Sequence, residues 1–402
     1  MNSSPNILVF GEIGLIRCFG EAGLRVLVAT SPHSRLPATY SRYCKKHIPF
    51  PLNSSDGFVD ALLDFGSKQN GVTYIASDDD QLVLKVSRNR EVLSQYFSFM
   101  LPDHEIVQSV VDKTLFSSLA NTYGLPVPKT FALRSQEDLE GAIQEIPLPC
   151  ILKPAQKKNW LKAEAQEALG GRKKGLTFSN RDDLVKTYGR MRSFSPDVVV
   201  QEYINGCDEC LYDLHALFDH NSNVVSFVLG RKIRTYPIHF GMGCYTETVR
   251  DDTITNIGLE ALEKLRYKGL ANMNLKKDSL TGEVKILEIN PRSSLWCYLD
   301  QFAGNNLSVK AYYISTGQPI SQPGTYDLGV RWRDFKNDFH SLLQYQKVGE
   351  WNFRSWIRSF RGKTAFHVFS LRDPLPYVVS VFQFAIRLIS KLSERLRGKF
   401  QN

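Results

Sequence analysis

The chain has 402 residues, of which 43% are hydrophobic and 23% are charged. This balance excludes a disordered protein, and the length allows two or three domains with hydrophobic cores of their own. A short polar segment leads directly into the apolar residues 7–10, without the basic segment and long apolar run of a secretory signal. We therefore expect a globular, multidomain protein that stays in the cytoplasm.

Seven cysteines are scattered along the chain, and this odd number indicates reduced thiols rather than a disulfide framework. Cys207 and Cys210 form a close pair, and together with His215 they could make half of a zinc or redox site. No second CxxC pair follows them. We therefore favour separate thiols over a metal site.

The net charge of +9 comes from the C-terminal part of the chain. Residues 331–402 contain 14 Lys or Arg and 5 Asp or Glu, whereas residues 1–330 contain 36 of each kind. The same C-terminal segment holds 14 of the 46 aromatic residues. Basic and aromatic side chains together suit a membrane surface. Nucleic acid is the competing partner, and we rank it lower because no RNP, zinc-finger or helix-turn-helix pattern accompanies the charge.

The first 105 residues alternate short apolar runs with amphipathic stretches. Residues 7–10, 26–29 and 72–76 are predicted as strands, and residues 13–22 and 58–68 as helices. This alternation predicts an open parallel sheet, in which ligands bind beyond the carboxyl ends of the strands.

Acidic residues follow two of these predicted strands. Glu12 follows the first strand, and Asp78 to Asp80 follow the strand at 72–76. We take Glu12, Asp78 and Asp80 as candidates for recognising an amine. The alternative is that they cap helices or face water.

Residues 106–320 are predicted to form an α+β unit. A helix is expected at 107–124, a strand bearing Lys153 at 150–154, and a mobile, glycine-containing lid around 170–174. Further strands are predicted at 198–201, 211–218, 224–229, 269–275 and 284–289, with a helix at 254–267.

Two oxygen-bearing side chains, Glu288 and Asn290, lie two residues apart on the last of these strands. The period of two along a strand points both to one face. One carboxylate and one amide oxygen make a sensible half-site for Mg²⁺, which fills its remaining positions with water and phosphate oxygens. Arg292 follows on the same face and could offer its planar fork to phosphate. The alternative is an edge strand with solvated polar groups.

Several motifs occur in a fixed order along the chain, and their joint occurrence is more specific than any one of them alone. Together they resemble the ATP-grasp superfamily over roughly residues 5 to 300. The motifs are Asp112-Lys113, Leu152-Lys153-Pro154, the run QEYING at 201–206 with Glu209 after it, and LEINPR at 287–292. The resemblance implies an N-terminal Rossmann-like, pre-ATP-grasp parallel sheet over residues 1–105. An ATP-grasp domain would follow at 106–320, with its lid at about 150–205.

The resemblance assigns roles to individual residues. Lys113 and Lys153 would reach the phosphates of ATP, and Lys153 would also act in catalysis. Glu202, Tyr203 and Ile204 would form the hinge that holds adenine, with Glu209 accepting from the ribose hydroxyls. A lysine held on a strand neutralises phosphate without a large reorganisation, which gives these assignments a physical basis.

A basic run, RKIR, ends the predicted strand that begins at 224. Alternation sends Arg231 to one face and Lys232, with Arg234, to the other. We expect Lys232 to bind nucleotide and Arg231 to meet the γ-phosphate or an acyl phosphate. A solvated basic turn remains the alternative for both residues.

The segment GLANMNLKKD at 269–278 resembles carboxylate–amine ligases within the superfamily, those of the D-aspartate ligase type most. These enzymes usually place a second acidic metal ligand where this chain has Asn274. A neutral amide removes one negative charge from the Mg²⁺ or Mn²⁺ site of Glu288, Asn290 and Asn274. Metal binding should therefore weaken unless Asp278 or phosphate oxygens compensate.

Residues 321–402 form a basic, aromatic-rich C-terminal extension. Prolines at 374 and 376 precede a helix predicted from 377 to about 397, with apolar residues recurring every three or four positions. Its uncharged stretch at 375–386 is too short to span a bilayer of about 30 Å. The helix could lie in the membrane interface, or it could dock on this protein's own core or on a partner subunit.

These observations predict an ATP-dependent carboxylate–amine ligase that forms an amide through an acyl phosphate. Its substrates would be a small carboxylate and a small amine, and the extension suggests a cell-envelope or surface-polysaccharide precursor. We expect no nucleic acid partner and a cytoplasmic location, with a peripheral position on the inner membrane face left open, as is a homo-oligomer. Alternatives are an ATP-binding protein with little or no catalysis, or a ligase with a thiol or hydroxyl acceptor.

Overall fold

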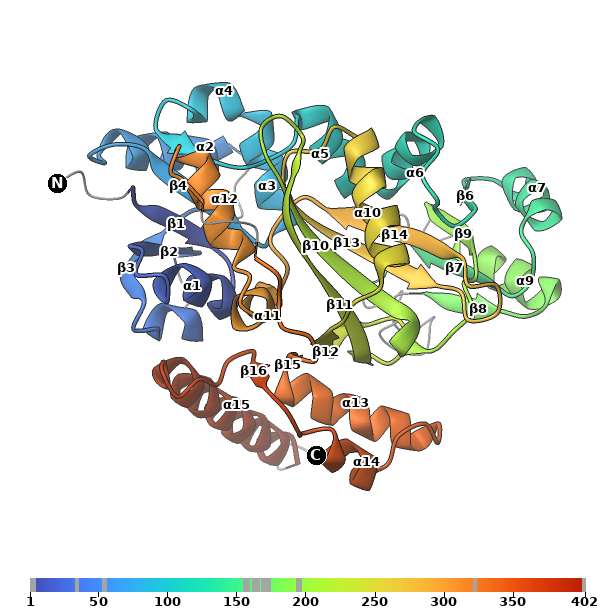
Figure 1. Cartoon of the computed structure of the whole chain (residues 1–402). Helices are drawn as coiled ribbons and strands as arrows, with labels where there is room; N and C mark the ends of the chain where they lie inside the picture. Colours follow the sequence, from blue (N-terminus) through green and yellow to red (C-terminus); the bar gives the residue numbers. More distant parts are fainter. Residues whose placement is uncertain are drawn as a thin grey trace.

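A computed structural model describes residues 5–32, 36–52, 56–154, 160, 167, 175–192, 197–320 and 324–399. The side chains of residues 56, 114, 387–389 and 391–399 lie outside the described part, and so does the lid candidate at 170–174. Three sheets organise the described chain, and Figure 1 shows the five-stranded and four-stranded sheets on opposite sides of the seven-stranded one.

The N-terminal sheet has five parallel strands in the order β3-β2-β1-β4-β5. Residues of β1 and β2 are buried throughout, as expected for parallel strands covered on both faces by helices. The parallel sheet predicted from the sequence is confirmed, with β3 and β5 as added strands. The elements are β1 (Ile7–Phe10), α1 (Ile13–Gly20), β2 (Val26–Thr30), η1 (Pro37–Tyr40), β3 (Cys44–Pro49), α2 (Asp56–Ser67), β4 (Thr73–Ser77), α3 (Asp80–Arg88), α4 (Arg90–Leu93) and β5 (Phe97–Ser98).

Two helices follow where the sequence predicted one. α5 (His104–Val111) ends at Asp112, whose extended backbone breaks the helix, and α6 (Lys113–Thr122) begins at the next residue. Asp112 Oδ1 accepts from the backbone N–H of Leu115 at 3.1 Å. A carboxylate satisfying an N–H of the first turn is typical of a helix start. This break brings Lys113 to the first position of a helix.

A small four-stranded antiparallel sheet has the strand order β6-β9-β7-β8. Its core includes Leu152 and Val200, which are contributed by neighbouring strands. The elements are β6 (Thr130–Leu133), α7 (Gln136–Glu145), β7 (Cys150–Pro154), β8 (Leu176–Phe178), α9 (Arg181–Met191) and β9 (Val198–Glu202).

The seven-stranded sheet has the order β14-β13-β10-β11-β12-β15-β16. One face packs on α10 and α6 through residues such as Leu214 and Met273, and the other packs on α11, α12 and the N-terminal sheet. The elements are η3 (Asp208–Cys210), β10 (Leu211–Phe218), β11 (Val224–Tyr236), β12 (Met242–Thr248), α10 (Asp252–Lys264), β13 (Gly269–Lys277), β14 (Val284–Asn290), α11 (Cys297–Phe302), α12 (Leu307–Ser315), β15 (Arg331–Arg333) and β16 (Thr364–Phe366).

The C-terminal extension is joined to this sheet through backbone hydrogen bonds. β15 pairs with β12 in antiparallel fashion and with β16 in parallel fashion. Three helices complete the extension, α13 (Phe335–Lys347), α14 (Phe353–Arg358) and α15 (Leu375–Lys399), and Figure 1 shows them along the lower edge of the molecule. Within the described residues, no helix is both long enough and apolar enough to cross a membrane.

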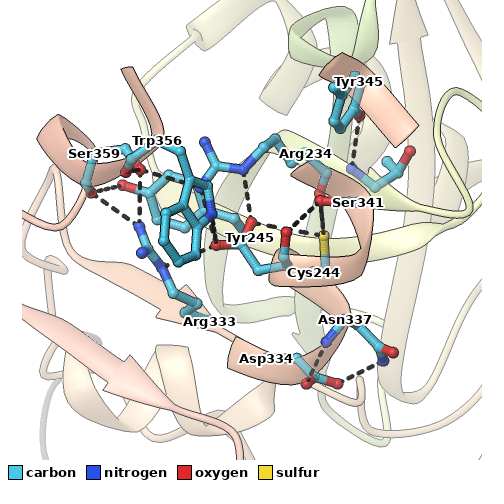
Figure 2. A network of polar contacts seen from close by, with 12 residues as sticks. Arg234, Cys244, Tyr245, Arg333, Asp334, Asn337, Ser341, Tyr345, Trp356 and Ser359 are labelled. Atoms are coloured by element: carbon cyan, nitrogen blue, oxygen red, sulfur yellow. Dashed lines mark hydrogen bonds and ion pairs between the residues drawn. The ribbon is translucent and has the colours of Figure 1, made fainter. Parts of the chain in front are cut away.

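A stack of cations and aromatic rings fastens the extension to the sheet, and Figure 2 shows its central members Arg234, Tyr245 and Arg333. The ring of Tyr245 lies between two guanidinium groups, 4.4 Å from that of Arg234 and 4.1 Å from that of Arg333. Trp351 covers the outer side of Arg234 at 4.4 Å, and Phe360 covers the outer side of Arg333 at 3.8 Å. Such contacts strengthen when the cation is desolvated, and both arginines are fully buried.

One carboxylate serves both arginines. Asp338 on α13 accepts from Arg234 Nε at 2.6 Å and lies 3.6 Å from Arg333 Nε. Trp356 on α14 donates its indole N–H to the same carboxylate at 2.9 Å. Because all of these groups are buried, the carboxylate is the main charge that balances the two cations.

A second anchor holds the start of α15 against the N-terminal sheet. Asp373 accepts from Arg17 Nε at 3.1 Å, from Ser41 Oγ at 2.8 Å and from the backbone N–H of Arg42 at 2.9 Å. Arg17 and Asp373 are almost completely buried. The extension is therefore bound both to the seven-stranded sheet and to the N-terminal part of the chain.

We predict that Asp338→Asn lowers the free energy of unfolding by about 3–5 kcal/mol, because it leaves two buried guanidinium groups without a balancing charge. Urea unfolding of the full chain measures the change. Asp327→Asn is the control, since Asp327 pairs with Lys363 at the surface at 2.8 Å and should contribute less than about 1 kcal/mol. Equal effects of the two substitutions would contradict the role given to Asp338.

Candidate nucleotide site

A row of polar side chains crosses three adjacent strands of the seven-stranded sheet. The register pairs Asp213 on β10 with Asn274 on β13, and Asn274 with Glu288 on β14. Alternate residues on these strands, such as Leu214 and Met273, enter the hydrophobic core on the opposite face. The row therefore lies on the face turned away from that core.

Lys153 lies close to two further lysines, Lys113 and Lys276, and to the carboxylate of Glu288. Lys153 on β7 has its pKa lowered to about 8, first by burial and then by the positive charges of Lys113 and Lys276, while the charge of Glu288 raises it. Lys153 Nζ donates to Gln201 Oε1 at 2.7 Å, and Lys113 Nζ lies 3.5 Å from the carbonyl oxygen of Pro154. Three ammonium groups and one carboxylate in this cluster give it a net positive charge, which suits a polyphosphate.

The hinge segment leaves β9 beside this cluster. Glu202 is tied to Lys129 twice, through its backbone N–H at 2.9 Å and through its carboxylate, which accepts the Lys129 N–H at 3.0 Å. Ile204 is buried, and the ring of Tyr203 lies 5.2 Å from Lys276 Nζ. The structure therefore brings the predicted hinge next to the lysines.

Asp278 locks the hinge to the turn after β13. Its carboxylate accepts from the backbone and side-chain nitrogens of Asn205, at 2.8 and 2.9 Å, and from the backbone N–H groups of Leu280 and Thr281. Despite burial, these hydrogen bonds lower the pKa of Asp278 to about 2. Because its oxygens are used in this way, Asp278 cannot supply the charge that Asn274 lacks.

Glu288 and Asn290 fit one Mg²⁺ ion. Asn290 donates its side-chain N–H to the carbonyl oxygen of Asn272 at 3.2 Å, and its amide oxygen lies 3.5 Å from Arg292 Nη2. A carboxylate and an oriented amide oxygen are sufficient protein ligands for Mg²⁺ when phosphates complete the shell. The oxygen of Asn274 is engaged differently, because it accepts from Lys232 Nζ at 2.7 Å.

Arg292 connects this site to the N-terminal sheet. Its fork meets Asp80, with Nε 2.6 Å from Oδ1 and Nη2 3.4 Å from Oδ2. The guanidinium of Arg292, which we expected to bind phosphate, therefore pairs with the carboxylate of Asp80 in the structure. Burial and this ion pair act in opposite directions on the arginine, and the net effect is a raised pKa of Arg292.

The other two acidic candidates lie at the same sheet edge. Asp78 accepts the backbone N–H of Glu12 at 2.7 Å, and burial raises the pKa of Asp78 to about 7. The side chain of Glu12 is exposed. Asp79 caps α3 by accepting the N–H of Leu82 at 2.8 Å. Of the acidic residues proposed to bind an amine, Glu12 is thus the one whose carboxylate faces solvent most openly.

Arg231 lies away from the group around Glu288. Arg231 on β11 is paired with Glu247 on β12, and its Nη2 lies 2.5 Å from Glu247 Oε1. Its side chain is on the face of the sheet opposite to that of Lys232. An irregularity in β11 between Lys232 and Arg234 then interrupts the alternation, so Arg234 joins Tyr245 rather than Lys232. The predicted alternation is wrong for Arg234 because of this bulge. Glu209 is exposed on η3.

The cysteine pair does not form a metal site with His215. Both carboxylate oxygens of Asp300 lie 2.9 Å from His215 Nδ1, and the two side chains are buried together. Cys207 is exposed and Cys210 is half-buried. Across the described ranges, no group of three His, Cys, Asp or Glu residues is arranged to hold a metal ion.

Sequence reasoning did not assign two residues that the structure places in the site. Lys276 lies two positions after Asn274 on β13, so strand periodicity was a signal that could have identified it. Asp213 gave no such signal, because only the pairing of β10 with β13 brings it beside Asn274.

Comparison with curated proteins finds relatives that are ligases or synthases. The chain is 27% identical to D-aspartate ligase from Enterococcus faecium over 322 residues, which are 77% of this chain and 75% of that protein. It is 24% identical to the carbamoyl phosphate synthase large chain from Methanothrix thermoacetophila over 274 residues, 64% of this chain but 23% of that protein. No protein-family model matches the chain.

Solved structures of similar fold include complexes with ADP. N5-carboxyaminoimidazole synthetase from Staphylococcus aureus, complexed with ADP, has a TM-score of 0.60 at 16% identity and covers 80% of each chain. The biotin carboxylase domain of 2-oxoglutarate carboxylase from Hydrogenobacter thermophilus, in complex with MgADP, ADP and bicarbonate, has a TM-score of 0.61 at 15% identity. It covers 82% of this chain and 74% of that chain.

The predicted parallel sheet, the mixed α/β architecture and these neighbours agree with one another. The chain therefore has the ATP-grasp fold that its motifs indicated, and it is a homologue of D-aspartate ligase.

Proposed function

We propose that the protein is an ATP-dependent ligase that joins a small carboxylate to a small amine. The observation that carries this proposal is the gathering of Lys113, Lys276 and Glu288 around Lys153, beside the hinge that follows β9. Such a site neutralises the phosphates of ATP by position and charge, without a nucleophile supplied by the protein.

The reaction would proceed in two steps. The substrate carboxylate attacks the γ-phosphate to give an acyl phosphate and ADP, and the amine then displaces phosphate to form an amide. Lys153 and Lys232 would hold the phosphoryl oxygens, and Glu288 with Asn290 would hold Mg²⁺. When bound, the metal neutralises charge that develops on the phosphates. Glu12, at the edge of the N-terminal sheet, is our candidate for meeting the ammonium form of the incoming amine.

The relative's name suggests where to begin with substrates. D-aspartate is the first carboxylate to test, paired with a panel of amino acids, amino sugars and amine-bearing cell-envelope fragments. ADP release that requires both partners supports the ligase. Nucleotide binding with no turnover over the whole panel would instead support an ATP-binding protein without catalysis, a reading that the neutral Asn274 favours. Mass spectrometry of the product separates an amide from a thioester or an ester.

Glu288→Gln is expected to abolish carboxylate- and amine-dependent ADP release while nucleotide still binds through the hinge. The amide keeps the size of the side chain but removes the one negative charge of the proposed metal pair. A coupled ADP assay and a fluorescent nucleotide titration measure the two quantities. Glu283→Gln is the matched control, since Glu283 is an exposed residue just before β14 and is ion-paired to Lys285. Full turnover in Glu288→Gln would contradict the mechanism.

The lowered pKa of Lys153 makes nucleotide affinity depend on pH. The ammonium is present below pH 8 and is lost as the pH rises through about 8. In buffer with a chelator, ADP affinity should therefore fall by about tenfold for each pH unit above 8. Calorimetric titration between pH 7 and 9.5 measures this fall.

Lys153→Arg is the control for this dependence, because a guanidinium stays charged throughout that range. The variant should bind ADP with little change between pH 7 and 9.5. An equal loss of affinity in the wild type and the variant would show that another group titrates.

We also propose that the C-terminal extension binds an anionic membrane surface. α15 exposes large apolar side chains, with Phe382 65% and Ile386 64% exposed, and α13 and α14 expose Phe339 and Phe353. Residues 331–402 carry the whole net charge of +9. Exposed apolar groups beside basic ones suit the interface of an anionic bilayer. A substrate made at the membrane, such as a cell-envelope or surface-polysaccharide precursor, would fit this position.

Flotation with liposomes tests the membrane proposal. The full chain should float with vesicles of anionic phospholipid at low salt and remain in solution with neutral vesicles. Phe382→Glu with Ile386→Glu should abolish flotation, because it places charge in the interface. Substitution is preferable to truncation at Arg372, which would remove Asp373 from buried Arg17. Leu280→Glu, at an exposed turn elsewhere, is the control. Flotation of the double variant equal to the wild type would refute the proposal.

A further inference from the structure

Lys232 is a buried cation held between two oxygens of the nucleotide site. Only 6% of its surface is exposed. Its Nζ lies 3.0 Å from Asp213 Oδ1 and 2.7 Å from Asn274 Oδ1. Burying an ammonium is costly unless it is paired and hydrogen-bonded, and these two contacts supply both conditions.

The position of this ammonium is defined by strand register. Asp213, Asn274 and Glu288 follow one another across β10, β13 and β14, and Lys232 reaches the first two of them from β11. The ammonium therefore lies in the row that contains the proposed metal ligand Glu288. A divalent ion placed between Asp213 and Asn274 would meet the ammonium there and be repelled by it.

The charges in this row balance without a second metal ion. Asp213 is 3% exposed and contributes one negative charge, which the single positive charge of Lys232 offsets. Asn274 contributes an oxygen and no charge. The ammonium, 3.0 Å from Asp213 Oδ1, therefore offsets the charge of that carboxylate.

We propose that Lys232 takes the place of a second divalent cation, an inference that rests on the proposed nucleotide function. The site would then use one metal ion, held by Glu288 and Asn290. Asn274 would accept a hydrogen bond from the ammonium, and Asp213 would be the counter-ion that keeps Lys232 protonated. A cation fixed by the fold faces the phosphates without reorganisation, which is the role that a second metal ion would otherwise fill.

The number of Mn²⁺ ions bound per chain tests this proposal without any turnover. Mn²⁺ is titrated into the full chain with an equimolar, non-hydrolysable ATP analogue, and free Mn²⁺ is read by electron paramagnetic resonance. The wild type should bind one ion. Lys232→Met leaves the Asp213 carboxylate without its cation, so a second ion should bind. Asn274→Asp, which keeps the side-chain size, should also raise the number to two, because two carboxylates then exceed one ammonium.

Lys277→Met is the control, since Lys277 lies on β13 three positions after Asn274 and pairs with Asp251 at 3.1 Å. Its complex should keep one Mn²⁺ ion. Two ions in the wild type would overturn the proposal, and so would one ion in both Lys232→Met and Asn274→Asp. Failure of the analogue to bind at all, measured by calorimetry, would contradict the proposed function itself. A count of two in the wild type would leave that function intact.

Discussion

The pairing of β13 between β10 and β14 is the constraint on which the site depends. This register brings together Asp213, Asn274 and Glu288, which are separated by 61 and 14 positions in the chain. A shift of β13 by one residue would turn the side chain of Asn274 to the hydrophobic face that holds Leu214 and Met273. Burial of the hydrophobic face therefore fixes the strand register, and this register in turn fixes the polar row on the other face. The proposed nucleotide site is thus built on regular strands, which hold side chains more precisely than loops do.

The C-terminal extension extends this rigid framework. Tyr245, on β12, is stacked between Arg234 and Arg333, and α13 supplies the carboxylate of Asp338 that balances them. Tyr345, also on α13, donates to Asp208, which begins η3 just after the hinge. The hinge is therefore in contact with the extension on one side and with the turn at Asp278 on the other. A surface that meets a membrane and a segment that holds adenine would then belong to one packed unit.

Motif order predicted the parts of the site that lie on regular elements. Lys153 and Glu288 are on strands whose apolar patterns are clear, and the ATP-grasp fold follows from them. The contacts that the sequence did not predict depend on tertiary structure. Arg292 meets Asp80, 212 positions away, because the N-terminal sheet edge faces β14. A bulge in β11 redirects Arg234, and an extended Asp112 divides one predicted helix into two. Periodicity cannot report a bulge, since the bulge is an exception to the period.

The central claim is that the nucleotide lies between the lysine cluster and the hinge. Amide hydrogen exchange of the full chain, with and without MgADP, tests it directly. The account predicts slower exchange at residues 202–206, at β7 around Lys153 and at β13 around Asn274, with exchange in α14 unchanged. Protection that is absent from these segments, or that appears instead in α13 and α14, would contradict the account.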